Sequence, residues 1–277
     1  MDRLERAGQA VRDTKPWVER LGRIGYAAKG AVYLIVGVLA AQAAIGAGGA
    51  TTDPKGALGW IVSTPHGRFL LGAMAIGLLG YAIWSFVQAG LDTENEGTNA
   101  KGLLARGGYA IIGAGYVGLA LSAASLTLGS GGGGSGDESA RDWTARLLAQ
   151  PFGQWLTGIL GAIIVAVGLY QLYKAVSANF RDKLKLAEMS STQQEWVERI
   201  GRLGFAALGV ASSIIGALLV AAAVHARAEE ARGLGGALAT LAQQPFGPWL
   251  LAAVAAGLVA YGIFEFIEAR FRRMVIR

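Results

Sequence analysis

The chain alternates between long apolar stretches and short polar connections. Six stretches contain no Lys, Arg, Asp or Glu: Gly30–Thr52, Phe69–Leu91, Gly107–Gly136, Leu147–Tyr173, Leu203–His225 and Gly233–Phe264. Each is long enough to hold the roughly 20 apolar residues that cross a hydrocarbon core. The pattern predicts six transmembrane helices, with cores at 23–45, 68–90, 105–128, 153–176, 202–224 and 247–269. The expected fold class is therefore an all-α integral membrane protein.

The polar connections predict the orientation of these helices. Of the 25 Lys and Arg residues, 18 fall on the side that carries both termini, and Lys29 lies inside the first helix. The positive-inside rule then places both termini in the cytoplasm. We expect residues 1–16 to form a cytoplasmic segment, 272–277 a cytoplasmic tail, and the first apolar stretch an uncleaved anchor. The expected location is the bacterial inner (plasma) membrane.

Composition supports the bilayer and removes several kinds of chemistry. The chain is 53% hydrophobic and only 16% charged, and it has 42 glycines and no cysteine. A soluble domain carries about a quarter charged residues, and the absence of cysteine excludes disulfides and thiolate metal sites. The net charge of +6 lies beside the apolar stretches, so we interpret it as membrane orientation and expect no nucleic-acid partner.

Two sequence units recur three times. An Arg-x-Gly-aromatic-Ala unit begins at Arg23, Arg106 and Arg202, and a Pro-x-Gly-x-aromatic-Leu unit begins at Pro65, Pro151 and Pro245. They define repeats at 17–91, 97–180 and 194–271, each crossing the membrane and returning. Because the repeats share one orientation, we expect a pseudo-threefold bundle. Short outer interfacial helices are expected at Gly56–Val62, Trp143–Leu148 and Leu234–Leu241.

These two units make the chain resemble the bacterial domain-of-unknown-function 1206 membrane family, over roughly residues 17–271. Against the Pro-Phe-Gly-x-Trp-Leu form of the second unit, repeat one departs at His66 and Phe69, and repeat two departs from the repeat pattern at Ile163 and Val167. The resemblance implies the topology of three two-helix repeats. It implies no activity, no cofactor and no catalytic residue.

Several motifs are best explained without chemistry. Gly113–Gly118 matches the dinucleotide fingerprint, but it lies inside a predicted span with no strand before it. The four-residue spacing of Ala110, Ala114, Gly118 and Ser122 instead predicts a small-residue packing ridge, and similar ridges occur at Gly158/Ala162/Ala166 and Gly209/Ser213/Ala217/Ala221. Ser130–Gly136 predicts a flexible linker. His66 and His225 have no carboxylate cluster nearby, so no metal site is expected.

Ionisable residues inside the spans are the candidate functional groups, because burying charge in lipid is costly. Lys29 and Glu265 have similar predicted depth, which permits an ion pair between the first and last repeats. That pair would act as a gate or an anion site, whereas the favoured interpretation is that both side chains snorkel to the interface. Arg23, Arg106 and Arg202 would form a ring that attracts anionic lipids or anions, against the favoured interpretation of interfacial anchors.

Two functional hypotheses remain. The first is a non-enzymatic membrane protein that serves as an accessory or structural component of a membrane complex, with lipids, another membrane protein or a second copy as partners. The alternative is a channel or a small-solute or ion transporter with a path along the pseudo-threefold axis. Few polar residues are available at the midplane of the spans, which favours the first hypothesis. A water-filled axial cavity lined by Lys29 and Glu265 would favour the second.

Overall fold

A computed structural model describes residues 3–94, 97–130 and 134–274, with side chains from residue 17 onward. Six helices are long and apolar enough to cross a membrane, as the sequence predicted. They are α1 (Arg3–Ala44), α3 (Gly67–Leu91), α4 (Ala100–Leu128), α6 (Gly153–Ser177), α7 (Ser191–His225) and α9 (Gly247–Phe271). The first helix, α1, continues back to Arg3, through most of the segment predicted to precede the first repeat. The described residues contain no β-strand.

In each repeat a short helix connects the first long helix to the second. These short helices are α2 (Pro54–Val62), α5 (Gly136–Leu148) and α8 (Leu234–Ala242). All three were predicted, but α5 begins earlier than expected. Ser135 and Glu138 form a capping box at its start, so the end of the predicted Ser130–Gly136 linker opens a helix. Residues 131–133 of that linker lie outside the described residues. We call this side of the bundle the short-helix face.

The opposite side, the basic face, carries both chain ends and the two connections between repeats. The connection from α6 to α7 contains two single 3₁₀ turns, η1 (Asn179–Lys183) and η2 (Leu186–Glu188). A third, η3 (Ala228–Glu230), lies on the short-helix face. Lys185 N–H donates to the Phe271 carbonyl at 2.8 Å, so the α6–α7 connection is joined to the end of α9.

The recurrent Pro-x-Gly unit makes the turn between each short helix and the next long one. The middle residue adopts a left-handed conformation in all three repeats, with φ of 66° at His66 and 61° at Phe152 and Phe246. A methyl group added at the glycine would lie 1.9–2.3 Å from a carbonyl oxygen of the preceding short helix, at Gly67, Gly153 and Gly247. Glycine is therefore required by close approach, which explains why this part of the unit recurs.

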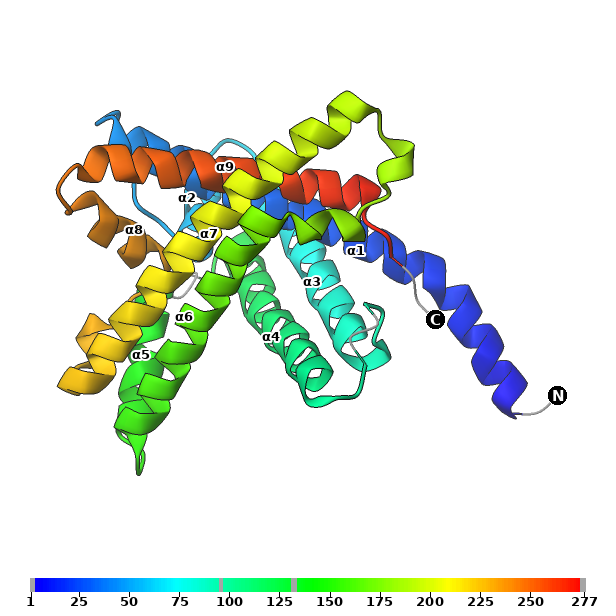
Figure 1. The fold of residues 1–277 in the computed structure, drawn as a ribbon, viewed down its shortest axis with the longest axis horizontal. Helices are drawn as coiled ribbons and strands as arrows, with labels where there is room; N and C mark the ends of the chain where they lie inside the picture. The colour runs from blue at the N-terminus through cyan, green and yellow to red at the C-terminus, as the bar shows by residue number, and fades with distance from the viewer. Residues whose placement is uncertain (1–2, 95–96, 131–133, 275–277) are drawn as a thin grey trace.

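Neighbouring repeats pack through three equivalent interfaces, which are α1 with α9, α3 with α4, and α6 with α7. Figure 1 shows these pairs as three limbs. The same position on the first long helix of each repeat makes a close approach to the facing carbonyl oxygen. A methyl group added there would lie at similar distances in the three interfaces: Gly30 to Gly262 at 2.8 Å, Gly113 to Ala82 at 3.2 Å, and Gly209 to Gly168 at 2.9 Å. These positions align in the repeats, and their recurrence supports the predicted threefold pseudo-symmetry.

The contacts inside each repeat do not recur in the same way. In repeat one, a methyl group added at Gly77 would lie 2.6 Å from Ala28 Cβ, and in repeat three the equivalent distance from Gly257 to Ala207 is 2.4 Å. Repeat two has Ile163 and Ile111 at these positions. Their side chains are 54% and 75% exposed, and α4 and α6 form no extended interface. In the part of the chain that the structure describes, the six long helices follow one another around a ring through five extended contacts, two within repeats and three between repeats. The sixth contact of the ring, between α4 and α6, is missing.

We name this gap in the ring the α4–α6 opening. It is defined by the residues whose equivalents are packed in the other two repeats: Gly108, Ile111 and Gly115 of α4, and Leu160, Ile163 and Val167 of α6. Methyl groups added at Gly108 and Gly115 would meet nothing within 4 Å. Bulky side chains thus replace the Ala–Gly contact that brings the two helices together in repeats one and three.

Two of the predicted small-residue ridges do not pack within the chain, and this part of the prediction was wrong. Gly118 of α4 has no neighbour within 4 Å of an added methyl group, and Ala162 and Ala166 of α6 are exposed. The ridge on α7 packs through Gly209, and Gly216 on the same helix would bring a methyl group within 2.6 Å of the Val165 nitrogen. Small residues at four-residue spacing occur on exposed helix surfaces as well as on packed ones, so spacing alone does not identify a packed ridge.

Candidate functional site

Lys29 and Glu265 form an ion pair inside the bundle. The chain places Lys29 on α1 and Glu265 on α9, and Lys29 Nζ lies 2.9 Å from Glu265 Oε1. The two residues are 9% and 1% exposed. The sequence-based interpretation that both side chains snorkel was therefore wrong, and the alternative ion pair is the observed arrangement. A gate or anion site at this pair stays a prediction.

Tyrosine side chains explain why the pair stays inside. Lys29 Nζ donates to the hydroxyls of Tyr81 at 3.1 Å and Tyr261 at 2.8 Å. The Glu265 carboxylate supplies the opposite charge through the ion pair, although neither of its oxygens accepts a hydrogen bond from a described residue. Tyr81 packs edge-on against Tyr116, with ring centroids 4.6 Å apart, and Tyr33 packs edge-on against Tyr261 at 5.0 Å. Residues from α1, α3, α4 and α9 thus enclose the charges, and burial is compensated by pairing.

The sequence pattern did not identify these tyrosines as partners of the ion pair. Tyr81 and Tyr261 occupy the same position in repeats one and three, and Val167 replaces them in repeat two. That alignment was available, but it could not show that the hydroxyls point at Lys29. The residue equivalent to Glu265 is Gln171, whose Nε2 donates to Ser212 Oγ at 3.2 Å in the α6–α7 interface. A polar contact therefore recurs, but the charged version occurs between the first and last repeats.

The three arginines of the recurrent unit are all engaged by protein groups. Arg23 donates to the carbonyls of Ala269 at 2.9 Å and Arg270 at 2.6 Å. In the same way, Arg106 donates to Ala89 at 2.7 Å and Gly90 at 2.9 Å. Arg23 therefore satisfies carbonyls at the C-terminal end of α9, and Arg106 does so at the C-terminal end of α3. A cation at these ends also complements the helix dipole.

Arg202, the third member of the predicted ring, has a different partner. Its Nη2 lies 2.8 Å from Glu198 Oε1. Arg23 forms the equivalent ion pair with Glu19 in addition to its contacts with α9, so Arg202 differs in lacking the cap between repeats. Binding of anionic lipids or anions by Arg23, Arg106 and Arg202 stays a prediction.

A second charged cluster joins the three repeats on the basic face. Glu94, in the α3–α4 connection, lies 2.9 Å from Lys183 Nζ of η1 and 2.7 Å from Arg272 Nη2, just after α9. We call these three residues the clasp. Arg272 also pairs with Glu268. Burial alone would raise the pKa of the Glu94 carboxyl, but the charges of Arg272 and Lys183 lower it to about 2, so Glu94 stays ionised at ordinary pH.

The clasp was not predicted from the sequence. Its members lie in the two connections between repeats and in the segment after α9, far apart in the chain, and no local spacing links them. Their only sequence signal was the presence of single charges just beyond the ends of the spans. The structure shows that these charges do more than set orientation, because they tie the basic ends of the repeats together.

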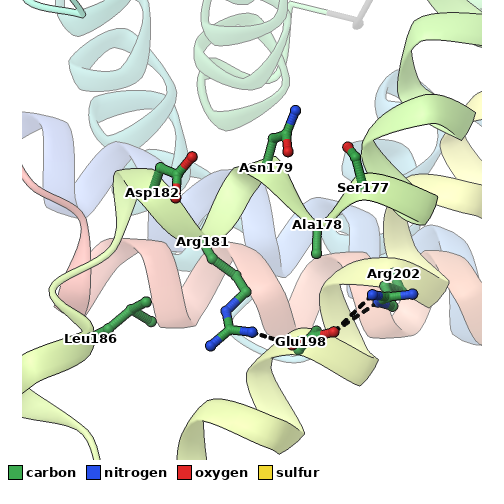
Figure 2. Close-up of a pocket in the computed structure, with 8 residues that line it drawn as sticks. All are labelled: Ser177, Ala178, Asn179, Arg181, Asp182, Leu186, Glu198 and Arg202. Atoms are coloured by element: carbon green, nitrogen blue, oxygen red, sulfur yellow. Dashed lines mark hydrogen bonds and ion pairs between the residues drawn. The ribbon is translucent and has the colours of Figure 1, made fainter.

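A surface cavity of about 380 Å³ lies on the basic face, at the junction of α6, η1 and α7 (Figure 2). In Figure 2 Glu198 lies between Arg181 and Arg202, and it forms ion pairs with both. None of the residues that line the cavity belongs to the Lys29–Glu265 cluster. The cavity is therefore a shallow surface feature and gives no route to the buried pair.

The described residues contain no group of three His, Cys, Asp or Glu side chains that could hold a metal ion. His66 lies in the turn before α3, and His225 Nδ1 lies 2.7 Å from Glu230 at the end of α7. The two histidines are thus in separate places, and neither joins a carboxylate cluster.

An all-helical fold with six membrane-length apolar helices, arranged as three parallel two-helix repeats, defines a class of multi-pass membrane protein. Within that class, the chain belongs to the family described as Domain of Unknown Function (DUF1206), whose sequence profile matches residues 24–92, 107–178 and 203–272. The chain is also 39% identical over 262 residues to the uncharacterized protein YxxB of Bacillus subtilis (strain 168), covering 95% of this chain and 94% of that one. No solved structure matches the chain.

Proposed function

We propose that the protein is a non-enzymatic accessory or structural component of a membrane complex, in the bacterial plasma membrane, with both termini in the cytoplasm. The observation that carries the proposal is the closed packing around Lys29 and Glu265. The clasp supports a structural role as well, because it links connections from all three repeats. The excess of Lys and Arg on the basic face supports the orientation.

Charged residues within membrane spans often mark a transport path, so the transporter alternative has to be weighed directly. A path needs groups that are free to bind and release a solute, yet Lys29 already forms an ion pair with Glu265 and hydrogen bonds to Tyr81 and Tyr261. Further toward the short-helix face, the buried side chains of Val32, Val36 and Leu258 belong to one apolar cluster. The centre of the bundle is therefore packed protein, which favours the accessory role.

The test is a flux assay on the purified full chain in liposomes, with a panel of ions and small solutes. We expect the wild type to show no flux above empty liposomes. The matched control is Gln171→Ala/Ser212→Ala, which removes the polar contact made by the Glu265 equivalent in the α6–α7 interface. Flux that Lys29→Ala/Glu265→Ala abolishes, and that the control variant retains, would establish transport and overturn the proposal.

A further inference from the structure

The α4–α6 opening lies beside a row of side chains on α6 that continues toward the basic face. The row runs Leu160, Ile163, Val167, Tyr170 and Lys174, at helical spacing. The equivalent residues in repeat three are Val254, Gly257, Tyr261, Phe264 and Glu268, and all of them are buried. In repeat two, Leu160, Ile163, Val167 and Tyr170 are exposed. The row is therefore a packing surface that has lost its internal partner.

The opening is bounded at both ends. At the basic face, Lys183 Nζ donates to the hydroxyl of Tyr109 on α4 at 3.2 Å, so the connection that follows α6 reaches across to α4. At the short-helix face, α2 packs against both α4 and α5, and Lys55 Nζ donates to Ser139 Oγ at 2.6 Å. The opening is thus a lateral slot between two bridged ends.

Lys174 lies at the basic end of this row and differs from its equivalents in the other repeats. Gln88 donates to Glu94 at 2.8 Å, and Glu268 pairs with Arg272. Among the described residues, the Lys174 side chain has neither a hydrogen bond nor an ion pair. Its Nζ lies over the rings of Tyr170 and Phe205, at 4.9 and 5.4 Å from their centroids. The other cations of this region, Lys183 and Arg272, are already paired with Glu94.

We propose that the α4–α6 opening binds an anionic phospholipid, with an acyl chain against Ile111, Ile163 and Val167 and the phosphate on Lys174. The negative charge of the phosphate complements the unpaired ammonium of Lys174. Lys174 lies at the basic end of the slot, which is where a lipid headgroup would lie. The proposal goes beyond the accessory role and does not depend on it. It deals with lipid occupancy, whereas the flux assay deals with transport.

The composition of the opening favours a lipid over a helix from another protein. Wherever helices of this chain cross closely within a repeat, an alanine faces a glycine, as Ala28 faces Gly77. Small residues allow such backbone approach in membranes. Ile111 and Ile163 stand at the equivalent positions, and their branched side chains hold helix backbones apart. A flexible acyl chain fits against them without requiring a close backbone contact.

The first test is native mass spectrometry of the full chain released from nanodiscs of phosphatidylglycerol or phosphatidylcholine. We expect retained phosphatidylglycerol, little phosphatidylcholine, and about fivefold weaker phosphatidylglycerol retention for Lys174→Gln, because one lysine near an anionic headgroup contributes about that factor. The matched control is Lys101→Gln, which removes a charge from an exposed position at the start of α4. Equal losses for the two variants, or equal retention of the two lipids, would overturn the proposal.

The second test identifies the occupant and does not depend on affinity. A photo-crosslinking amino acid is placed at Ile163, and in a control variant at Leu128, which is exposed at the end of α4. After irradiation in membranes, we expect a phosphatidylglycerol adduct at residue 163 in excess of that at residue 128. Adducts to a second copy of this chain or to another protein at residue 163, without the lipid adduct, would contradict the proposal. Circular dichroism melting confirms that each variant is folded.

Discussion

At the scale of single residues, the Lys29–Glu265 pair shows how a membrane protein keeps two charges away from water. The ammonium has a carboxylate and two hydroxyls around it, so its charge is paired and two of its donors have hydroxyl acceptors. Such a pair is weak evidence for added stability, because the loss of solvation offsets the attraction. Removing one partner is a different matter, since it leaves a buried charge without compensation.

We therefore expect the single and double replacements of this pair to behave differently. Lys29→Met and Glu265→Met should each lower the free energy of unfolding by about 3–5 kcal/mol, whereas Lys29→Met/Glu265→Met should be close to the wild type. Denaturation of the purified protein in detergent, followed by circular dichroism, measures both. If the double variant loses as much stability as the two single variants together, the two residues are not energetically coupled.

At the scale of the helices, contacts between repeats depend on a few glycines where backbones nearly touch. Gly216 on α7 is one of them, since an added methyl group would lie 2.6 Å from the Val165 nitrogen and 2.7 Å from the Gly161 carbonyl oxygen. Gly118 on α4 has the same residue type and a similar apolar setting, but its surroundings are open. The two residues form a matched pair for testing which ridges pack.

A larger side chain should be tolerated at one of these glycines and not at the other. Gly216→Leu should destabilise the protein by about 1–3 kcal/mol or more, because overpacking forces the two backbones apart. Gly118→Leu should change stability little, since the new side chain faces the membrane. Thermal melting of both variants in the same detergent gives the comparison. Equal destabilisation would mean that the α4 ridge is packed in the native protein.

The same glycines show what the sequence could and could not predict about the elements. Stretches without charge predicted all six spans, because an isolated charge is costly in the hydrocarbon region and therefore rare there. The Pro-x-Gly unit recurs for a local steric reason, which is the close approach of its glycine to the preceding short helix. The packed ridges could not be chosen correctly, because Gly118 and Gly216 differ only in what lies opposite them.

At the scale of the whole molecule, the repeats predicted the pseudo-threefold arrangement but not its interruption. Ile163 and Val167 were visible departures in repeat two. Their consequence depends on Ile111, which lies on another helix and has an equivalent, Ala28, that packs against Gly77. From the sequence, the Lys29–Glu265 ion pair rested only on the similar predicted depth of the two residues. The pair forms in place of snorkelling because tyrosine hydroxyls point at Lys29, and only the fold sets that direction.

The most direct test of the interrupted ring is oxidative cross-linking of paired cysteines, since the chain has none of its own. Ala28→Cys/Gly77→Cys places two side chains in direct contact within repeat one, close enough for a disulfide after a small shift. Ile111→Cys/Ile163→Cys places them at the equivalent positions across the α4–α6 opening. After oxidation in native membranes and proteolytic mass spectrometry, we predict a disulfide for the first pair and none for the second. Equally efficient disulfides in both pairs would show that α4 and α6 close the ring, and would contradict the existence of the opening.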